Sequence, residues 1–172
     1  IRTESCAPRF LTYGCAVGLD TMTTRLRVAG REVALGAHPV GTDLRRINQV
    51  LANPEVRNNI FKLRREIGAR KLVLSVERLD YTKGTLAKLE ALESHPQLHN
   101  KVTLLMICVP AAKEMTVYRQ LQNAIEQAVG RINGRFARMD WTPVRFFAQA
   151  FPFEEVVAHY AAAQVMWICL LY

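Results

Sequence analysis

The sequence predicts an α/β fold in which a parallel β-sheet is covered by helices on both faces. Four apolar runs of strand length recur along the chain, and a helix-like segment follows each of the first three. The runs lack an alternation of polar and apolar residues, so both faces of each strand are expected to be buried. Buried strands that alternate with helices are typical of a parallel sheet. The runs are KLVLSV, VTLLMICV, VRFFAQ and VMWICLL.

The first section of the chain, through residue 43, predicts a β-hairpin. The stretch LRVAGREVALGAHPVGTD contains short alternating pieces on either side of Gly30. Glycine favours a turn at that point, and a break at Pro39 and Gly41 would close the hairpin.

Residues 44–67 predict two helices that divide at Pro54. Proline is favoured in the first turn of a helix, and Asn53 directly before it has a side chain suited to an N-cap. Gly68 is expected to end the second helix, because glycine readily adopts the left-handed conformation found at helix ends.

From residue 71 onward, strands and helices alternate regularly. The predicted strands cover residues 71–76, 102–109, 144–149 and 165–171, and the predicted helices cover residues 86–94, 114–132 and 153–163. Asn133-Gly134 is expected to close the long middle helix, whose apolar residues recur near the helical period. Arg131 and Arg135 would then complement the dipole at the carboxyl end of that helix.

Composition favours a folded protein that binds anions. Half of the 172 residues are hydrophobic, and 23 Lys and Arg against 15 Asp and Glu give a net charge of +8. A basic balance favours anionic partners such as phosphorylated metabolites. The cations are scattered and form no long run, so we expect no nucleic-acid-binding arm.

Cysteines and histidines predict no metal site. Cys6, Cys15, Cys108 and Cys169 lack the CxxC spacing of zinc sites, and the four histidines have no ligand spacing. Cys108 and Cys169 lie in apolar runs and are predicted to be small buried side chains. The longest apolar stretch is too short to span a bilayer, and no signal peptide is visible, so we expect a soluble cytoplasmic protein with no membrane partner.

The stretch SVERLDYTKGT places two cations after the first predicted strand of the sheet. Arg78 and Lys83 are five residues apart, and Gly84 directly follows the lysine. Ligands of such sheets bind beyond the carboxyl ends of the strands, where helix N-termini present free N–H groups. We expect a phosphate here, bound by the Arg78 fork and the Lys83 charge while Gly84 allows a close backbone approach. The alternative is a solvated loop with a surface contact between Arg78 and Asp80.

A second basic loop, VPAAKE, follows the next strand and carries Lys113. Two basic loops at one edge of a sheet suit a pair of ligands that contain several phosphates. No GxGxxG motif is present, which argues against a nicotinamide dehydrogenase, and no Ser/His/Asp or Cys/His triad can be assembled.

These loops belong to a longer series of motifs. GAHPVGTD, SVERLDYTKGT, VPAAKEMTVY, VGRINGRFARMDWTPV and VMWI, in this order, resemble the trehalose-6-phosphate synthase family of retaining glycosyltransferases, from about Arg9 to Ile168. The resemblance implies a glycosyltransferase B (GT-B) fold, in which two Rossmann-like domains face each other across a cleft. Residues 1–43 would end the N-terminal, acceptor-side domain. Residues 44–172 would form the first part of the C-terminal, nucleotide-sugar-binding domain.

The resemblance also implies roles for the site residues. The family motif V-x-R-x-D-Y-x-K-G matches Val76 to Gly84. It assigns Arg78 and Lys83 to the donor diphosphate, whose charge they would stabilise as the leaving group departs. The main chain at Cys108 would lie near the donor base, and Lys113 would bind the acceptor phosphate. Trehalose-6-phosphate synthases typically carry an arginine at the latter position, so the lysine favours a different acceptor.

The reaction implied by the resemblance is glucose transfer with retention from a nucleotide sugar. In the branch of the family that we favour, ADP-glucose is the donor and glycerol 3-phosphate the acceptor. The product, once dephosphorylated, would serve as a compatible solute under salt stress. Neither a protein nucleophile nor a metal or other cofactor is expected. The alternatives are UDP-glucose with glucose 6-phosphate, a non-catalytic nucleotide-sugar-binding domain and, on net charge alone, nucleic-acid binding.

Two departures from the family pattern concern the ends of the chain. The family's acidic-glycine loop should follow VMWI, where this sequence has CLLY, and the family's N-terminal glycine-rich loop and histidine would precede Ile1. We therefore expect the chain to be a piece of a longer protein and to be inactive alone.

Overall fold

The chain falls into two compact units, Ile1–Asp43 and Leu44–Tyr172. The computed structural model describes residues 25–28, 30–34, 41–110 and 116–169. In the first unit, β1 (Arg25–Val28) and β2 (Arg31–Ala34) pair as an antiparallel hairpin. Gly30 occupies the turn with a φ of 75°, a conformation that glycine adopts without strain, so the predicted hairpin is confirmed. The expected break at Pro39 lies outside the described residues.

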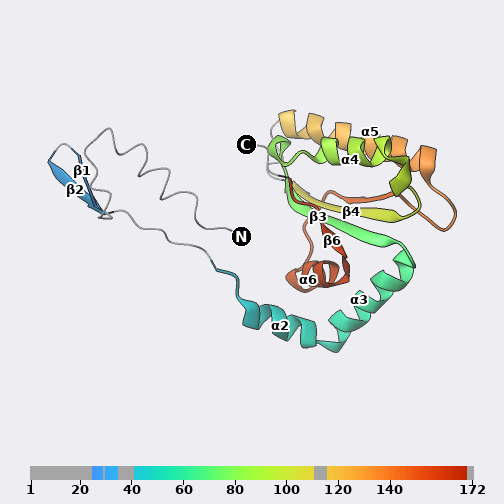
Figure 1. The fold of residues 1–172 in the computed structure, drawn as a ribbon, viewed down its shortest axis with the longest axis horizontal. Coiled ribbons are helices and arrows are strands. Elements are labelled where there is room, and N and C mark those ends of the chain that lie inside the picture. Colours follow the sequence, from blue (N-terminus) through green and yellow to red (C-terminus); the bar gives the residue numbers. More distant parts are fainter. Residues whose placement is uncertain (1–24, 29, 35–40, 111–115, 170–172) are drawn as a thin grey trace. The chain divides into compact units, whose positions relative to one another are not determined.

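The second unit contains one four-stranded sheet with the order β5-β4-β3-β6 (Figure 1). Every pairing in this sheet is parallel, as the alternation of buried strands and helices predicts. The strands are β3 (Lys71–Leu79), β4 (Val102–Pro110), β5 (Val144–Phe147) and β6 (Val165–Met166).

Helices cover both faces of this sheet. Figure 1 shows α4 and α5 on one side of the strands and α3 and α6 on the other. The helices are α2 (Leu44–Ala52), α3 (Pro54–Ile67), α4 (Thr85–Ser94), α5 (Thr116–Phe136) and α6 (Phe153–Ala162).

Two apolar clusters form the core, one on each face of the sheet. Leu104 and Met106 of β4 pack on the α4 and α5 side, together with Leu89 of α4 and Ile125 of α5. Leu105, between those two β4 residues, packs on the other side. Successive side chains of a strand point to opposite faces, so an unbroken apolar run supplies both clusters at once.

The predicted start and end of α3 are confirmed. The Asn53 side chain accepts a hydrogen bond from the Glu55 backbone N–H at 2.9 Å, and Pro54 is the first helical residue. Gly68 follows the helix with a φ of 67°, and its N–H donates to the Arg64 carbonyl at 3.0 Å. These signals depend only on neighbours in the sequence.

The predicted end of α5 is wrong, because the helix continues through Asn133 and Gly134 to Phe136. Instead of capping the helix, the Asn133 amide donates to the Val144 carbonyl at 2.8 Å and accepts from the Val144 N–H at 3.0 Å. Both polar groups of this side chain thus join α5 to the start of β5.

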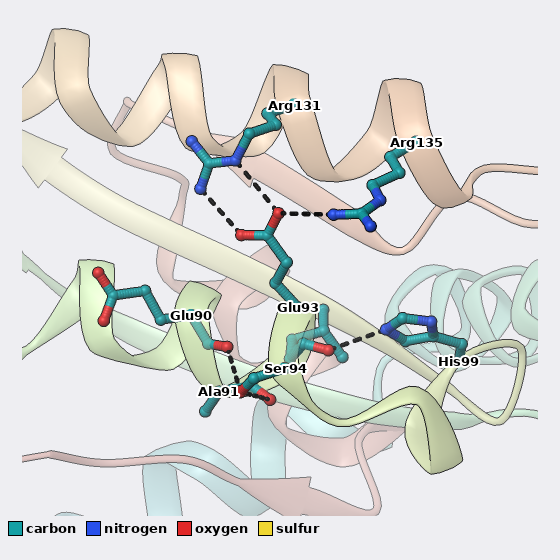
Figure 2. Close-up of polar contacts among 8 residues, drawn as sticks. Glu90, Ala91, Glu93, Ser94, His99, Arg131 and Arg135 are labelled. Atoms are coloured by element: carbon teal, nitrogen blue, oxygen red, sulfur yellow. Dashed lines mark hydrogen bonds and ion pairs between the residues drawn. The ribbon is translucent and has the colours of Figure 1, made fainter.

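The longer helix also corrects the role expected of Arg131. This residue lies more than one turn before the end of α5, and its Nε and Nη2 donate to the Glu93 carboxylate at 3.2 and 2.9 Å. Figure 2 shows the two groups facing each other, with Arg135 on the same side. Arg135 does lie in the last turn, and its guanidinium carbon is 5.1 Å from the centre of the Phe136 ring.

All four strand lengths differ from those predicted, although β4 is longer by Pro110 alone. β3 continues beyond residue 76 to Leu79, β5 ends at Phe147 and β6 contains only Val165 and Met166. After β6, the Trp167 side chain packs against the core, and Cys169 is half-buried where a buried side chain was expected. An apolar run in the sequence indicates which residues are buried. The length of a strand depends instead on how many of its residues pair with a neighbouring strand.

Candidate functional site

The two strands that precede the basic loops end level with each other. In the register of β3 and β4, Glu77 lies opposite Cys108 and Arg78 opposite Val109. Arg78 is therefore part of β3 rather than of the following loop, where the sequence placed it, because β4 continues beside it. Both strands end at the same edge of the sheet, the edge where ligands of parallel α/β sheets bind.

A capped turn follows β3. The Asp80 carboxylate accepts hydrogen bonds from the Thr82 N–H at 2.9 Å and the Thr82 hydroxyl at 2.8 Å. The bond from the Thr82 backbone is the main cause that lowers the pKa of Asp80 from its ordinary value of 3.8, and the charges of Arg78 and Lys83 lower it further. The carboxylate thus organises the segment that carries the two cations.

Gly84 ends this turn in the left-handed conformation, with a φ of 61° and a ψ of 31°. A Cβ atom at this position would lie 3.1 Å from the Cys169 sulfur, so glycine is required for the backbone conformation and for the close approach of a neighbouring segment. Helix α4 begins directly afterwards at Thr85.

The two cations are accessible at this edge. Arg78 is exposed and Lys83 is half-buried, and no hydrogen bond or ion pair joins either side chain to another residue in the part of the chain that the structure describes. Within the described residues Arg78 and Asp80 form no direct ion pair, although the charge of Arg78 helps to lower the pKa of Asp80. Two cations without a partner at a strand end can bind an anion.

Cys108 lies beside this segment, at the end of β4, and is completely buried as predicted. Burial raises the pKa of its thiol to about 12, and the negative charge of Glu77 adds to the effect. The thiol therefore stays protonated and unreactive at neutral pH. Only its main chain can take part in binding a ligand.

Two charged residues that the sequence did not single out lie beneath the segment. Lys88 of α4 and Glu77 of β3 form a buried ion pair. The available signal was the position of Lys88 in a helical stripe with Thr85, Leu89 and Leu92, all of which α4 buries. A lysine in such a stripe indicates a buried partner.

The other predicted site residue, Lys113, lies outside the described residues. Within the described ranges, no cluster of three or more His, Cys, Asp or Glu side chains could bind a metal ion. The same part of the chain contains no helix with the length and apolarity needed to cross a bilayer.

One relative is similar in sequence over nearly the whole of this chain. A glucosylglycerol-phosphate synthase of Pseudomonas anguilliseptica is 60% identical over 172 residues, which make up 98% of this chain and 23% of that protein. The chain therefore spans about a quarter of that relative's length.

Two solved structures with a similar fold are those of trehalose-phosphate synthases. The enzyme of Burkholderia vietnamiensis has a TM-score of 0.82 at 29% identity, over 98% of this chain and 37% of that one. The enzyme of Burkholderia xenovorans in complex with glucose-6-phosphate has a TM-score of 0.75 at 30% identity, over 86% of this chain and 33% of that one. These likenesses confirm the predicted class, a Rossmann-like α/β sheet of the GT-B type.

The family itself follows from a match over nearly the whole chain. The model described as Glycosyltransferase family 20 matches residues 1–171. The parallel sheet, the basic segment at its carboxyl edge and the two kinds of relative all agree with this match. The chain belongs to glycosyltransferase family 20.

Proposed function

We propose that this chain is the donor-binding part of a retaining glucosyltransferase that transfers glucose from ADP-glucose to sn-glycerol 3-phosphate. The observation that carries the proposal is the 60% identity to a glucosylglycerol-phosphate synthase over nearly the whole chain. The solved trehalose-phosphate synthases, at 29–30% identity, make UDP-glucose with glucose 6-phosphate the second candidate pair.

Arg78 and Lys83 have the central role in this proposal. When the bond between C1 of glucose and the donor diphosphate breaks, its electron pair leaves with the diphosphate. A hydroxyl oxygen of the acceptor forms the new bond to C1, and the proton of that hydroxyl passes to the departing diphosphate. Two cations placed at the diphosphate stabilise that charge as it develops, which lowers the barrier without a protein nucleophile. Their accessibility, and their lack of a partner among the described residues, support this role.

The remaining site residues complete the proposed binding mode. Gly84 allows the backbone to approach the diphosphate, the main chain at Cys108 lies near the donor base, and Lys113 binds the acceptor phosphate as a point charge. Residues 1–43 belong to the acceptor-side domain and residues 44–172 to the donor-binding domain of a cytoplasmic enzyme. The reaction uses no cofactor or metal, so excess chelator should leave the rate unchanged.

A chimera tests the proposed reaction. Residues 1–171 of this chain would replace the matching segment of the Pseudomonas anguilliseptica relative, whose identity over this region makes the exchange conservative. Purified chimera would receive ADP-glucose or UDP-glucose with glycerol 3-phosphate or glucose 6-phosphate, and the product would be identified by mass spectrometry. The unchanged relative, in parallel, reports whether the assay itself works.

We expect glucosylglycerol phosphate from ADP-glucose and glycerol 3-phosphate. Trehalose 6-phosphate as the main product would replace the proposal with the second candidate. Binding of a nucleotide sugar without any product would identify a non-catalytic domain. The chain tested alone should bind the donor without turnover.

Single substitutions test the proposed roles. Arg78→Gln and Lys83→Gln should each lower kcat/KM of the chimera by about a hundredfold, as the loss of other transition-state charge donors does. Lys62→Gln, which removes an exposed lysine of α3, is the matched control and should have no effect. Lys113→Arg should raise the rate with glucose 6-phosphate relative to glycerol 3-phosphate, because arginine offers a bidentate fork.

A further inference from the structure

Polar residues interrupt the face of β3 that packs beneath α4. Val73 and Leu79 of this strand contact the apolar cluster on the α4 side, whereas Leu72 and Leu74 contact the opposite cluster. Ser75 and Glu77 occupy the α4 side between Val73 and Leu79, since alternate residues of a strand share a face. A hydroxyl group and a carboxylate therefore lie between the two apolar residues of this face.

Lys88 of α4 forms an ion pair with the Glu77 carboxylate. Its Nζ donates to Glu77 Oε2 at 2.6 Å and to Ser75 Oγ at 2.9 Å. The other carboxylate oxygen of Glu77 accepts from the Thr85 hydroxyl at 2.9 Å. The side chains of Lys88 and Glu77 are only 1% and 6% exposed. These four residues form one buried polar network in which both charges have partners.

The network touches both ends of the segment that carries the two cations. Glu77 directly precedes Arg78, and Thr85 directly follows Gly84. The backbone N–H of Lys88 also donates to the Gly84 carbonyl at 3.1 Å. Residues 78–84 thus begin directly after one member of the ion pair and end directly before the helix that carries the other.

A buried ion pair is an inefficient way to stabilise a fold. The cost of removing two charges from water offsets most of their attraction, and apolar side chains of similar volume often stabilise a protein as well or better. Such a pair does fix the geometry of the groups that it joins, because each charge must keep its partner. The effect of this pair should therefore appear in the geometry of residues 78–84 more than in overall stability.

We propose that the buried Lys88–Glu77 pair is a positioning device that sets the separation of Arg78 and Lys83 to suit a diphosphate. The inference rests on the proposed function, which assigns the donor diphosphate to those two cations. Lys88 does not itself touch the donor, since its ammonium group is buried against Glu77 and Ser75. It is a positioning residue, and its charge neutralises a carboxylate that would otherwise repel the ligand.

The double variant E77Q/K88M tests the proposal. It removes both charges together, conserves side-chain volume and leaves no buried charge without a partner. In the 172-residue chain, the expected result is an unfolding midpoint near that of the unchanged protein and a Kd for ADP-glucose raised about tenfold or more, since small displacements of binding groups have large effects. In the chimera, the KM for the donor should rise while the KM for the acceptor stays the same.

The ion pair at the other end of α4 provides the matched control. E93Q/R131Q removes an exposed pair between the same helix and α5, far along the helix from residues 78–84. Hydrogen exchange gives a second readout at the backbone N–H groups of Lys83 and Lys88, which bond to Asp80 and Gly84. Their exchange should accelerate in E77Q/K88M and remain unchanged in the control.

Thr85→Val provides a milder variant in case the double variant does not fold. It removes one hydrogen bond to Glu77 without changing any charge, and it should weaken ADP-glucose binding in the same direction by a smaller factor. Unchanged affinity and unchanged exchange in the folded variants would overturn the inference. If the unchanged chain and Arg78→Gln bind the donor equally, or neither binds it, the proposed function fails instead, and hydrogen exchange alone decides whether the pair positions the segment.

Discussion

Helix α4 carries an ion pair near each of its ends, and the two pairs differ in their surroundings. Lys88–Glu77, in the first turns, has side chains 1% and 6% exposed, and a serine and a threonine complete its hydrogen bonds. Glu93–Arg131, in the last turn, has side chains 20% and 55% exposed (Figure 2). The charges are alike, yet water screens only the second pair. Burial, and not the kind of charge, thus determines which pair can hold neighbouring segments in a fixed geometry.

The largest effect is expected from breaking the buried pair on one side. Lys88→Met leaves the Glu77 carboxylate buried without a cation, and the free energy of unfolding should fall by about 3–5 kcal/mol. Urea unfolding, followed by circular dichroism, measures the change. E77Q/K88M should recover most of the loss. An equal loss in the single and double variants would show that lost packing, and not the unpaired charge, is responsible.

The next effect concerns the glycine between the buried pair and the cations. Gly84→Ala would place a Cβ in a left-handed conformation and 3.1 Å from the Cys169 sulfur, so we expect a loss of about 1–2 kcal/mol. The matched control is Gly134→Ala, because Gly134 lies inside α5 with nothing near its Cβ position and alanine favours a helix there. In thermal unfolding, the midpoint should fall for Gly84→Ala and rise for Gly134→Ala. A change of the same sign in both variants would contradict the requirement for glycine at residue 84.

A smaller effect concerns the thiol beside the buried pair. With its pKa raised to about 12, Cys108 has about a thousandfold less thiolate than an ordinary cysteine at pH 8. Iodoacetamide should label Cys169 and spare Cys108, as peptide mapping would show.

Because the pKa of the Cys108 thiol is raised in the folded chain, the associated stability is fully present below the ordinary value of 9.0 and is lost as the pH rises through about 12. Cys108→Ser should lose less stability than the unchanged chain over that alkaline range.

The smallest effect is expected at the exposed pair. The hydrogen bond from Arg131 is the main cause that lowers the pKa of Glu93 from its ordinary value of 4.5. A lowered pKa gives stability that is present above the ordinary value and is lost as the pH falls through the lowered one. Glu93→Gln should therefore be slightly less stable than the unchanged chain at pH 7, and the difference in stability should shrink as the pH falls below 4.5. Added salt should reduce the difference at pH 7, and a difference insensitive to salt would indicate a buried interaction.

Several features of the fold could be predicted because they depend on neighbours in the sequence. The Asn53 cap, the Gly68 helix end and the Gly30 turn each involve groups a few residues apart, and all three are confirmed. The apolar runs likewise predicted the strands and the parallel sheet. The same local reasoning placed Arg78 and Lys83 together in the loop after the strand; Lys83 does lie in the turn there, whereas Arg78 belongs to β3 itself.

Other features depended on partners that only folding brings together. Asn133 has the local pattern of a helix end, but its bonds to Val144, which lies 11 residues further along, replace that role. A lysine is ordinarily expected to be exposed to solvent, but Lys88 is buried because folding brings Glu77, also 11 residues away, into contact with its ammonium group. The sequence by itself determined the order of the elements and the residues at the sheet edge, since backbone propensity and periodicity act locally. Tertiary structure decided which charges are buried and which helix ends are real, because burial and hydrogen bonding at those positions depend on segments from elsewhere in the chain.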